Sequence, residues 1–412
     1  MPNADDVAAE AAQLASRLGL GAVDSLPRGG LEAKLREARG EARPLRVKLG
    51  IDPTAPDIHL GHAVVLRKLR EFQDAGHRVV LIIGDYTARV GDPSGRSEQR
   101  PMLSEAEIDA NAATFQAQAL KILDDDPERL EVRRNSEWLD MPMVDLLGLA
   151  RTTTAAQLLE RDDFAKRMAA EQPISVLELL YPMLQGYDSV AIEADVELGG
   201  TDQKFNLLLG RDIQRAYGQR EQAIMTMPIL VGIDGRRKMS KSHGNEIGVT
   251  DAPEEMYGKT MAIPDEAIAE YRRLLLDPPS GGRAPVREGG NGGLSARNAK
   301  RALAHDLVAW LHSPEDAAAA ERHFDRVFVE HEAPEEIEEA TVDGDGGLVH
   351  LPVLIAEEFG ISRSEARRLI DQGGVTLGDS LLEAGEHDVS LERADGQVLK
   401  VGRRRFRRLR AG

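Results

Sequence analysis

His59 and His62 stand three residues apart, directly after a turn that two prolines stiffen. Gly61 between them carries no side chain, so a flat ligand could lie against the backbone there. Imidazoles at the start of a helix can donate to phosphate oxygens, and the helix dipole adds partial positive charge. The same histidines could instead cap the helix or face solvent, whereas a metal pair would lack the Glu of an HExxH motif and a nearby third ligand. We interpret this segment as a phosphate site.

Lys238 and Lys241 lie in the segment Lys-Met-Ser-Lys-Ser, which follows an expected strand at 225–231 and a short turn. Two lysines on a loop rich in hydroxyl groups can close over a polyphosphate and neutralise the charge that grows on a departing pyrophosphate. A lysine-rich pentamer alone would more often be a solvated loop. Together with the two histidines, however, it resembles the paired signatures of the class I aminoacyl-tRNA synthetases.

Three carboxylates and their neighbours could bind the rest of a substrate. Tyr181, Gln185 and Asp188 share one face of a helix expected over 177–188, which suits a small zwitterion but could also be a solvated face. Asp92 could meet an ammonium group, or simply belong to a type I turn. Asp202 follows two glycines at a helix start, where it could accept from ribose hydroxyls or only complement the helix dipole.

These residues require a sheet to hold them. Residues 45–51 alternate like a strand, 60–75 have helical spacing closed by Gly76, and 79–83 form a continuous apolar run that suits a buried parallel strand. Residues 103–175 read as a helical insertion, and 196–198 as a further strand. The expected fold is therefore α/β, a Rossmann-like parallel sheet whose ligands bind where the first turn meets its helix.

Composition limits the alternatives. The 412 residues allow two or three domains, and the absence of cysteine excludes disulfides and fits a reducing, cytoplasmic compartment. No apolar run is long enough to span a membrane, and the acidic N-terminus is unlike a signal peptide. The formal charge of −18 would argue against a nucleic-acid partner if it were evenly distributed, but the C-terminal end is basic.

The chain is expected to divide into four parts: a catalytic domain over 1–242, a helical domain over 243–329, an acidic linker over 330–348 and a small α+β domain over 349–412. Within the last part, an expected helix at 362–370 and the run at 403–410 carry arginines with little acid among them, a pattern that suits phosphate contacts. The candidates for RNA binding are Arg363, Arg367, Arg368, Arg403, Arg404 and Arg405.

Several motifs in order resemble the tyrosyl-tRNA synthetases, in particular their larger bacterial branch. They are the Asp-Pro-Thr-Ala start of the histidine segment, Gly-Asp-Pro-Ser-Gly at 91–95, Leu-Gln-Gly-Tyr-Asp at 184–188, Gly-Gly-Thr-Asp-Gln at 199–203 and the lysine loop. The resemblance covers nearly the whole chain. It implies a helical anticodon-side domain, a C-terminal domain like an RNA-binding ribosomal protein, and a homodimer.

The resemblance also implies roles for individual residues. The amino group of tyrosine would be held by Asp92, Tyr181 and Gln185, its phenol by Asp188, and its carboxylate together with the α-phosphate by Gln203. The ATP would be held by Asp52, Thr54, His59, Gly61, His62, Gly200, Asp202, Lys238, Ser240 and Lys241, with Arg96 and Arg100 in support. The implied reaction forms tyrosyl-adenylate and then charges tRNA(Tyr), with Mg²⁺ on the pyrophosphate and no covalent enzyme intermediate.

One position departs from the family. Lys48 stands where many members have a tyrosine that touches the substrate phenol, so either an ammonium takes that place or the side chain points elsewhere and contributes only its stem. Our hypothesis is that Lys48 pairs with Asp188 or donates to the phenol oxygen. Two other interpretations stay open from the sequence: an enzyme of the tryptophan-activating sister class, and a non-catalytic RNA-binding protein descended from a synthetase.

Overall fold

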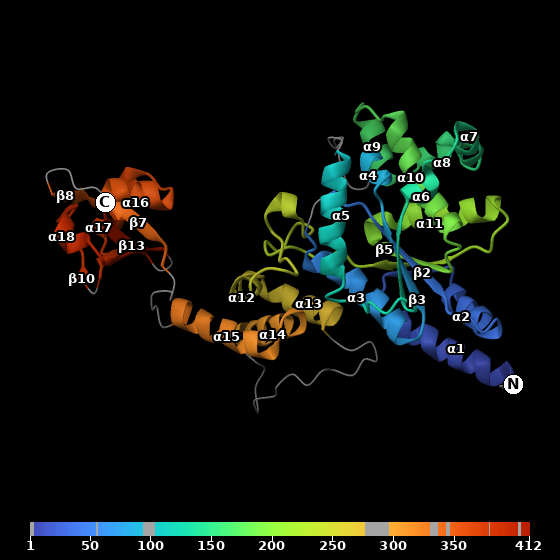
Figure 1. Ribbon diagram of the computed structural model, residues 1–412, viewed down its shortest axis with the longest axis horizontal. Helices are drawn as coiled ribbons and strands as arrows, with labels where there is room; N and C mark the ends of the chain where they lie inside the picture. The colour runs from blue at the N-terminus through green and yellow to red at the C-terminus, as the bar shows by residue number, and fades with distance from the viewer. Residues whose placement is uncertain are drawn as a thin grey trace. The chain divides into compact units, whose positions relative to one another are not determined.

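The computed structural model describes residues 4–54, 57–93, 104–276, 296–329, 337–342, 347–378, 380–402 and 405–412. The chain forms two compact units, Met1–Ser313 and Pro314–Gly412 (Figure 1). This division is coarser than the four parts expected from the sequence, whose individual bounds stay a prediction. No helix among the described residues is long and apolar enough to cross a membrane.

A six-stranded sheet organises the first unit, in the order β1-β6-β5-β2-β3-β4. Its strands are β1 (Asp24–Leu26), β2 (Arg46–Ile51), β3 (Arg78–Ile83), β4 (Leu130–Arg134), β5 (Val196–Gly200) and β6 (Ala223–Met227). All neighbours are parallel except β1 and β6. After β2 the chain forms β3 on one side of β2, and it later forms β5 on the other side of β2. In a doubly wound sheet this reversal of strand order is where ligands bind.

The strands at the centre of the sheet form because their side chains are apolar and buried on both faces. Val79, Val80, Leu81 and Ile82 of β3 are at most 1% exposed. The expected elements at 45–51, 60–75 and 79–83 are confirmed by β2, α3 (Leu60–Asp74) and β3. Helix α3 packs on β3 and β5, so its N-terminus is held at the carboxyl ends of the central strands.

The expected helical insertion is only partly helical. It holds α5 (Glu105–Ala119), α6 (Ser136–Leu139), α7 (Met143–Ala150), α8 (Ala155–Leu159) and α9 (Asp162–Ala169). Residues 130–134, however, form β4, which pairs with β3 in register from Val79–Leu130 to Ile83–Arg134. The prediction missed β4 because an edge strand needs no continuous apolar run, and this one reads Leu-Glu-Val-Arg-Arg.

Helices α10 (Val176–Ala191) and α11 (Lys204–Ala216) cross at two glycines. A Cβ at Gly186 would lie 2.6 Å from Ile213 Cδ1 and 3.3 Å from the Cα of Gly210, so neither helix could carry a larger residue there without moving apart. Leu184 and Leu209, which are buried beside the crossing, share an apolar core with Leu149 of the insertion. This close approach sets the separation of the two helices that flank β5.

The rest of the first unit is helical, with α1 (Ala4–Leu18), α2 (Gly30–Gly40), α4 (Thr87–Val90), α12 (Pro253–Ala262), α13 (Ile268–Leu275) and α14 (Ala296–Leu311). Short 3-10 turns cover Thr201–Gln203, Lys241–His243 and Asp265–Ala267. The helical character expected for 252–276 and for 295–328 agrees with these helices and with α15 (Pro314–Phe324) of the second unit.

The second unit is α+β around its own apolar core. After α15 and a π-helical turn (Asp325–Val329) come β7 (Glu339–Val342), β8 (Leu348–His350), α16 (Leu351–Phe359), α17 (Arg363–Asp371), β9 (Val375–Leu377), β10 (Ser380–Leu381), β11 (Asp388–Ser390), α18 (Leu391–Ala394), β12 (Val398–Val401) and β13 (Arg405–Ala411). Residues 339–342 were expected to be linker, but they form β7, which pairs in parallel with β13.

Candidate active site

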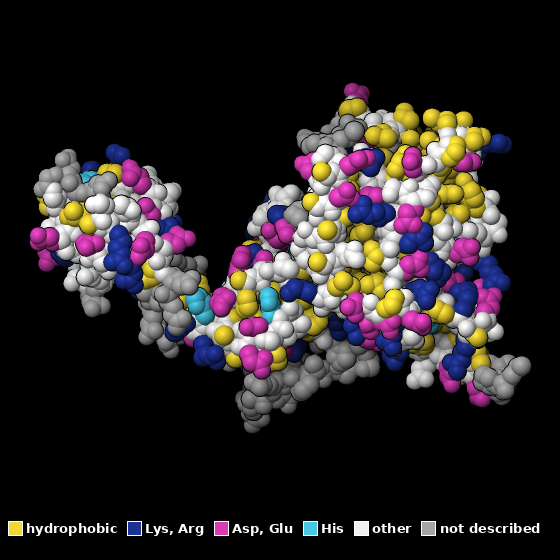
Figure 2. Space-filling model, viewed as in Figure 1, with side chains coloured by type: hydrophobic (Ala, Val, Ile, Leu, Met, Phe, Trp, Pro, Cys, Tyr) yellow, Lys and Arg dark blue, Asp and Glu magenta, His cyan; other side chains and the backbone are white. Residues whose placement is uncertain are grey.

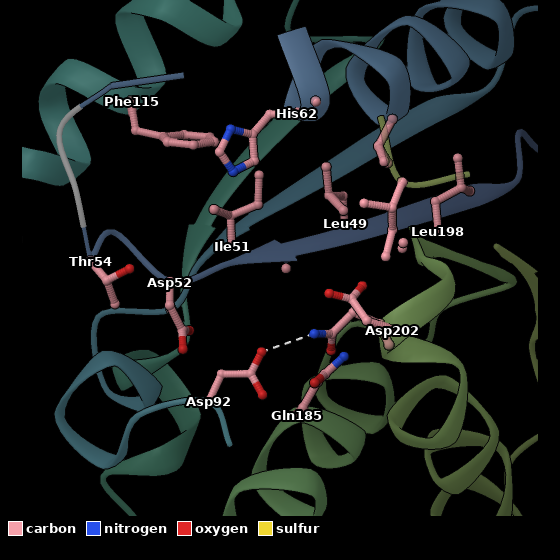
Figure 3. A pocket seen from close by; sticks show the side chains of 18 of the residues that line it. Leu49, Ile51, Asp52, Thr54, His62, Asp92, Phe115, Gln185, Leu198 and Asp202 are labelled. Carbon is pink, nitrogen blue, oxygen red and sulfur yellow. Dashed lines mark hydrogen bonds between the residues drawn. The ribbon is translucent and has the colours of Figure 1, made fainter. Parts of the chain in front are cut away.

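One cavity of about 660 Å³ opens at the carboxyl ends of β2 and β5. Residues of the histidine segment, the carboxylate-bearing helix α10, the glycine pair before α11 and the lysine loop all line it. Figure 3 shows Asp52, Asp92 and Gln185 converging at one end and His62 beside Phe115 at the other. The sequence-predicted residues that line this cavity are Asp52, Thr54, His59, Gly61, His62, Asp92, Tyr181, Gln185, Asp188, Gly200, Asp202, Gln203, Lys238, Ser240 and Lys241.

The two histidines cap α3 as well as facing the cavity. His59 Nδ1 accepts from the backbone N–H of Gly61 at 3.2 Å, and His62 Nδ1 accepts from the backbone N–H of His59 at 3.3 Å. Because both Nδ1 atoms accept, each ring carries its proton on Nε2. Burial, reinforced by Lys238, lowers the pKa of His62 to about 4, and the pKa of His59 lies lower still. Both rings are therefore neutral donors at pH 7.

Gly61 is required by this capping arrangement. A Cβ at this position would lie 2.9 Å from both Cε1 and Nδ1 of the His59 ring. The two imidazoles stack with their centroids 4.0 Å apart. Any side chain at position 61 would push the His59 ring off its capping hydrogen bond.

Asp52 lies at the end of β2 under two hydroxyl groups. Thr87 Oγ1 donates to one carboxylate oxygen at 2.6 Å and the Tyr181 hydroxyl donates to the other at 2.9 Å. Burial raises the pKa of Asp52 to about 7, with a smaller contribution from the charge of Asp92, and the two hydrogen bonds oppose the shift. Thr87 was missed from the sequence, because only the fold brings the start of α4 over β2.

Asp188 is held from the insertion. Trp138 Nε1 donates to one carboxylate oxygen at 2.8 Å, and Asn135 Nδ2 lies 3.5 Å from the other. Burial raises the pKa of Asp188 to about 6, and the charge of Lys48 and these two donors oppose the shift. The carboxylate is therefore mostly ionised at pH 7 and can accept a hydrogen bond. Trp138 and Asn135 follow β4, so the sequence prediction, which missed this strand, did not identify them as partners of Asp188.

The lysine loop is joined to the rest of the cavity by two ion pairs. Lys238 Nζ lies 3.5 Å from Asp202, and Lys241 pairs with Asp57 beside the histidine segment. The loop itself is tied by Asn245, which is 2% exposed: its Oδ1 accepts from the Ser240 N–H at 2.9 Å. Asn245 was not identified from the sequence.

Lys48 does not lie where it was expected. Its side chain is fully buried and is not part of the cavity lining. Its ammonium group lies 2.8 Å from Glu197, donates to Ser189 Oγ at 2.8 Å and to the Gln185 carbonyl at 2.9 Å. Among the described residues its ion-pair partner is thus Glu197 rather than Asp188, because the β2 and β5 side chains at this register point to the same face of the sheet.

The remaining predicted residues lie elsewhere. Arg96, Arg100, Arg403 and Arg404 lie outside the described residues. Arg363, Arg367 and Arg368 are exposed on α17, and Arg405 is exposed on β13 of the second unit.

Comparisons with known proteins agree with this geometry. The sequence model of the family described as "tRNA synthetases class I (W and Y)" matches residues 40–329. A tyrosine–tRNA ligase of Moorella thermoacetica is 51% identical over 392 residues, which are 94% of this chain and 94% of the relative. A tyrosine–tRNA ligase of Thermotoga maritima is 53% identical over 371 residues, 89% of this chain and 91% of the relative.

Solved structures show the same fold. A C-terminally truncated mitochondrial tyrosyl-tRNA synthetase of Aspergillus nidulans superposes with a TM-score of 0.62 at 22% identity, covering 79% of this chain and 99% of that one. The tyrosyl-tRNA synthetase of Archaeoglobus fulgidus in complex with L-tyrosine gives 0.57 at 24% identity, covering 76% and 99%. With two relatives near 50% identity over almost their whole length, the chain belongs to the tyrosyl-tRNA synthetases, a family of class I aminoacyl-tRNA synthetases.

Proposed function

We propose that this enzyme activates L-tyrosine with ATP and transfers the tyrosyl group to the 3′ end of tRNA(Tyr). The observation that carries the proposal is the single cavity lined both by the histidine and lysine segments and by Asp92, Tyr181 and Asp188. Its two ends have different chemistry. Imidazole and ammonium donors gather at one end, as a triphosphate needs, and the lysines there are paired with Asp57 and Asp202. Asp92 and Asp188 lie at the other end, as an ammonium and a phenol need.

At the tyrosine end, Asp188 accepts the hydrogen bond of the substrate phenol. Its own donors, Trp138 and Asn135, hold both of its oxygens in place before the substrate arrives. Asp92, the hydroxyl of Tyr181 and the amide of Gln185 surround the substrate ammonium. Preorganised polar groups of this kind bind without the cost of reorienting, so they favour tyrosine over an amino acid that lacks the hydroxyl.

At the nucleotide end, the neutral imidazoles of His59 and His62 donate from Nε2 to phosphate oxygens, and the N-terminus of α3 adds partial positive charge. Lys238 and Lys241 leave Asp202 and Asp57 to neutralise the β- and γ-phosphates. Asp202 is thereby released to accept from the ribose hydroxyls beside Gly200. The ion pairs of the free enzyme keep both lysines at the cavity before ATP binds.

The chemical step needs no enzyme nucleophile. The tyrosine carboxylate oxygen attacks the α-phosphorus, the bond to the bridging oxygen of the β-phosphate breaks, and pyrophosphate leaves with that electron pair. The enzyme contributes position and charge stabilisation. Within the described residues no cluster of three or more carboxylates or imidazoles could hold a metal ion, so we propose that Mg²⁺ arrives with the ATP phosphates and adds to their neutralisation.

Exchange of labelled pyrophosphate into ATP tests the activation step. We expect exchange that depends on L-tyrosine, with no comparable exchange on L-tryptophan or L-phenylalanine. Lys241→Ala should slow the exchange strongly while leaving the equilibrium binding of tyrosine unchanged. Absence of tyrosine-dependent exchange by the intact chain would refute the proposal, and exchange on tryptophan would assign the chain to the sister specificity.

A homodimer is supported by an apolar surface of the insertion. Met143, Val144 and Leu147 of α7 are 67%, 71% and 58% exposed, and Val176 at the start of α10 is 73% exposed. Figure 2 shows hydrophobic side chains gathered over this region. Exposed apolar patches of this kind mark protein interfaces. We propose that a second copy covers the patch. Light scattering should give twice the chain mass, and Leu147→Lys should give the monomer; a monomeric parent chain would refute this part.

The second unit supports a tRNA contact through α17. Arg363, Arg367 and Arg368 are exposed, and within the described residues none of the three pairs with a carboxylate. Arg363 and Arg367 lie one helical turn apart, a spacing that suits successive phosphates. We propose that they bind tRNA(Tyr) while the first unit performs activation. The cytoplasmic location stays a prediction.

A further inference from the structure

Asn206 is buried behind the tyrosine end of the cavity and does not line it. It is the third residue of α11, and the contact between Gly186 and Gly210 brings this helix close enough for its side chain to reach Gln185 on α10. Its amide nitrogen donates to Gln185 Oε1 at 2.8 Å and to Gln203 Oε1 at 3.1 Å. A single buried amide therefore contacts both glutamines of the cavity.

The orientation of the Asn206 amide is set by Arg161. A guanidinium group can only donate, and Arg161 Nη1 donates to Asn206 Oδ1 at 3.0 Å, so the amide nitrogen must face the other way. Arg161 is itself 4% exposed and held by both oxygens of Asp163, at 3.0 and 2.8 Å. The arginine thus fixes one end of the chain of hydrogen bonds.

The other ends of this hydrogen-bond network are carboxylates, which can only accept. Gln203 Nε2 donates to Asp92 Oδ2 at 2.9 Å, the bond drawn in Figure 3, and Gln185 Nε2 lies 3.5 Å from Glu197 Oε1. Each glutamine amide therefore lies between an obligate donor and an obligate acceptor. Turning either amide over would place oxygen against a carboxylate and nitrogen against a nitrogen, which removes two hydrogen bonds at once.

We propose that Asn206 is a positioning residue for tyrosine binding, setting which face Gln185 and Gln203 present to the substrate. With the amides oriented as observed, the Gln185 oxygen keeps a lone pair for the substrate ammonium, and Gln203 holds Asp92 through its nitrogen. Asn206 itself never touches the substrate. This inference deepens the proposed function and rests on it for the identity of the ligand.

Asn206→Asp tests the inference, because it keeps the shape but replaces the donor by an acceptor. Both glutamines must then turn their nitrogens toward the new carboxylate, which aims the Gln203 oxygen at Asp92 and the Gln185 oxygen at Glu197. We expect the Kd for L-tyrosine to rise roughly 10- to 100-fold, the range expected for losing one or two charge-assisted contacts. The KM for ATP should change less than twofold.

Binding of 3-(4-hydroxyphenyl)propionate, which lacks the amino group, separates positioning from a general structural effect. In Asn206→Asp, the Kd of this compound should rise by a factor at least fivefold smaller than the factor by which the Kd of tyrosine rises. Asn206→Ala, which removes the donor without adding charge, should show the same selectivity with a smaller loss. The matched control is Gln73→Glu: Gln73 is fully buried near the C-terminus of α3, whose opposite end carries the cavity residues His59 and His62, and its nitrogen donates to two carbonyl oxygens at 2.9 and 3.2 Å.

The control should lower thermal stability without a selective loss of tyrosine. Equal losses of tyrosine, the deamino compound and ATP in both Asn206 variants would overturn the inference, as would unchanged tyrosine affinity. The two proposals fail separately: a parent chain that binds tyrosine but catalyses no tyrosine-dependent exchange refutes the function, while the binding data on Asn206 still decide its role.

Discussion

Removing the ammonium group of Lys48 should chiefly destabilise the first unit, and it should affect tyrosine binding only indirectly. Lys48 is 0% exposed and Glu197 is 1% exposed, so Lys48→Met leaves a carboxylate buried without its cation. Loss of one partner of a buried pair costs about 3–5 kcal/mol. Glu197 still accepts from Ser189 at 3.2 Å and from Gln222, so we expect the lower end of that range. For a unit of this size that corresponds to a fall in Tm of roughly 5 °C.

A double-mutant cycle measures the pair itself. Glu197→Leu in the Lys48→Met background removes the unpaired carboxylate, so the double variant should regain a large part of the stability lost by Lys48→Met alone. Thermal unfolding of the parent chain, the two single variants and the double variant at pH 7 gives the coupling free energy. A fall in Tm below about 1 °C for Lys48→Met, or additive losses in the double variant, would refute the buried pair.

The same variant tests how Lys48 acts on the substrate. Its charge is one of the influences that hold down the pKa of Asp188, which burial raises to about 6. Without Lys48 that pKa rises further, so tyrosine affinity should fall at pH 7 and recover at higher pH, where Asp188 ionises again. If rejection of phenylalanine were lost at every pH instead, Lys48 would have to reach the phenol, contrary to its buried position.

Three further outcomes are expected. Asn245→Ala removes the bond to the Ser240 N–H, so it should raise the KM for ATP and speed tryptic cleavage of the lysine loop while leaving the Kd for tyrosine within twofold; unchanged cleavage would contradict the role of Asn245. His62 has a folded-state pKa near 4, below its ordinary 6.5, so the native state loses stability as pH falls from 6.5 toward 4, and His62→Asn should lose less over that window in thermal unfolding. Arg363→Ala with Arg367→Ala should weaken tRNA binding and flatten its dependence on salt, with tyrosine-dependent exchange intact; a parallel loss of exchange would show a folding defect instead.

The residues of the two signature segments could be predicted because their chemistry is local. His59, Gly61 and His62 lie at the start of a helix that the apolar spacing after them predicts, and apolar runs predict the central strands. The edge strand at 130–134 could not be predicted in this way. It pairs with β3 alone, so its other edge has no neighbouring strand and its charged side chains can reach solvent. Missing it also hid Asn135 and Trp138, which follow that strand.

By itself, the sequence predicted most of the polar side chains that line the cavity, although not Thr87 or Asn135, and it predicted the βαβ unit of the central strands. Only the tertiary structure decided the ion-pair and hydrogen-bond partners of the polar side chains around the site. These partners are Glu197 for Lys48, Trp138 and Asn135 for Asp188, and Asn206 for Gln185 and Gln203. The physical reason is that a buried polar group must find its partner wherever the packed elements bring one. That choice depends on sheet register and helix crossing, which no single stretch of residues encodes.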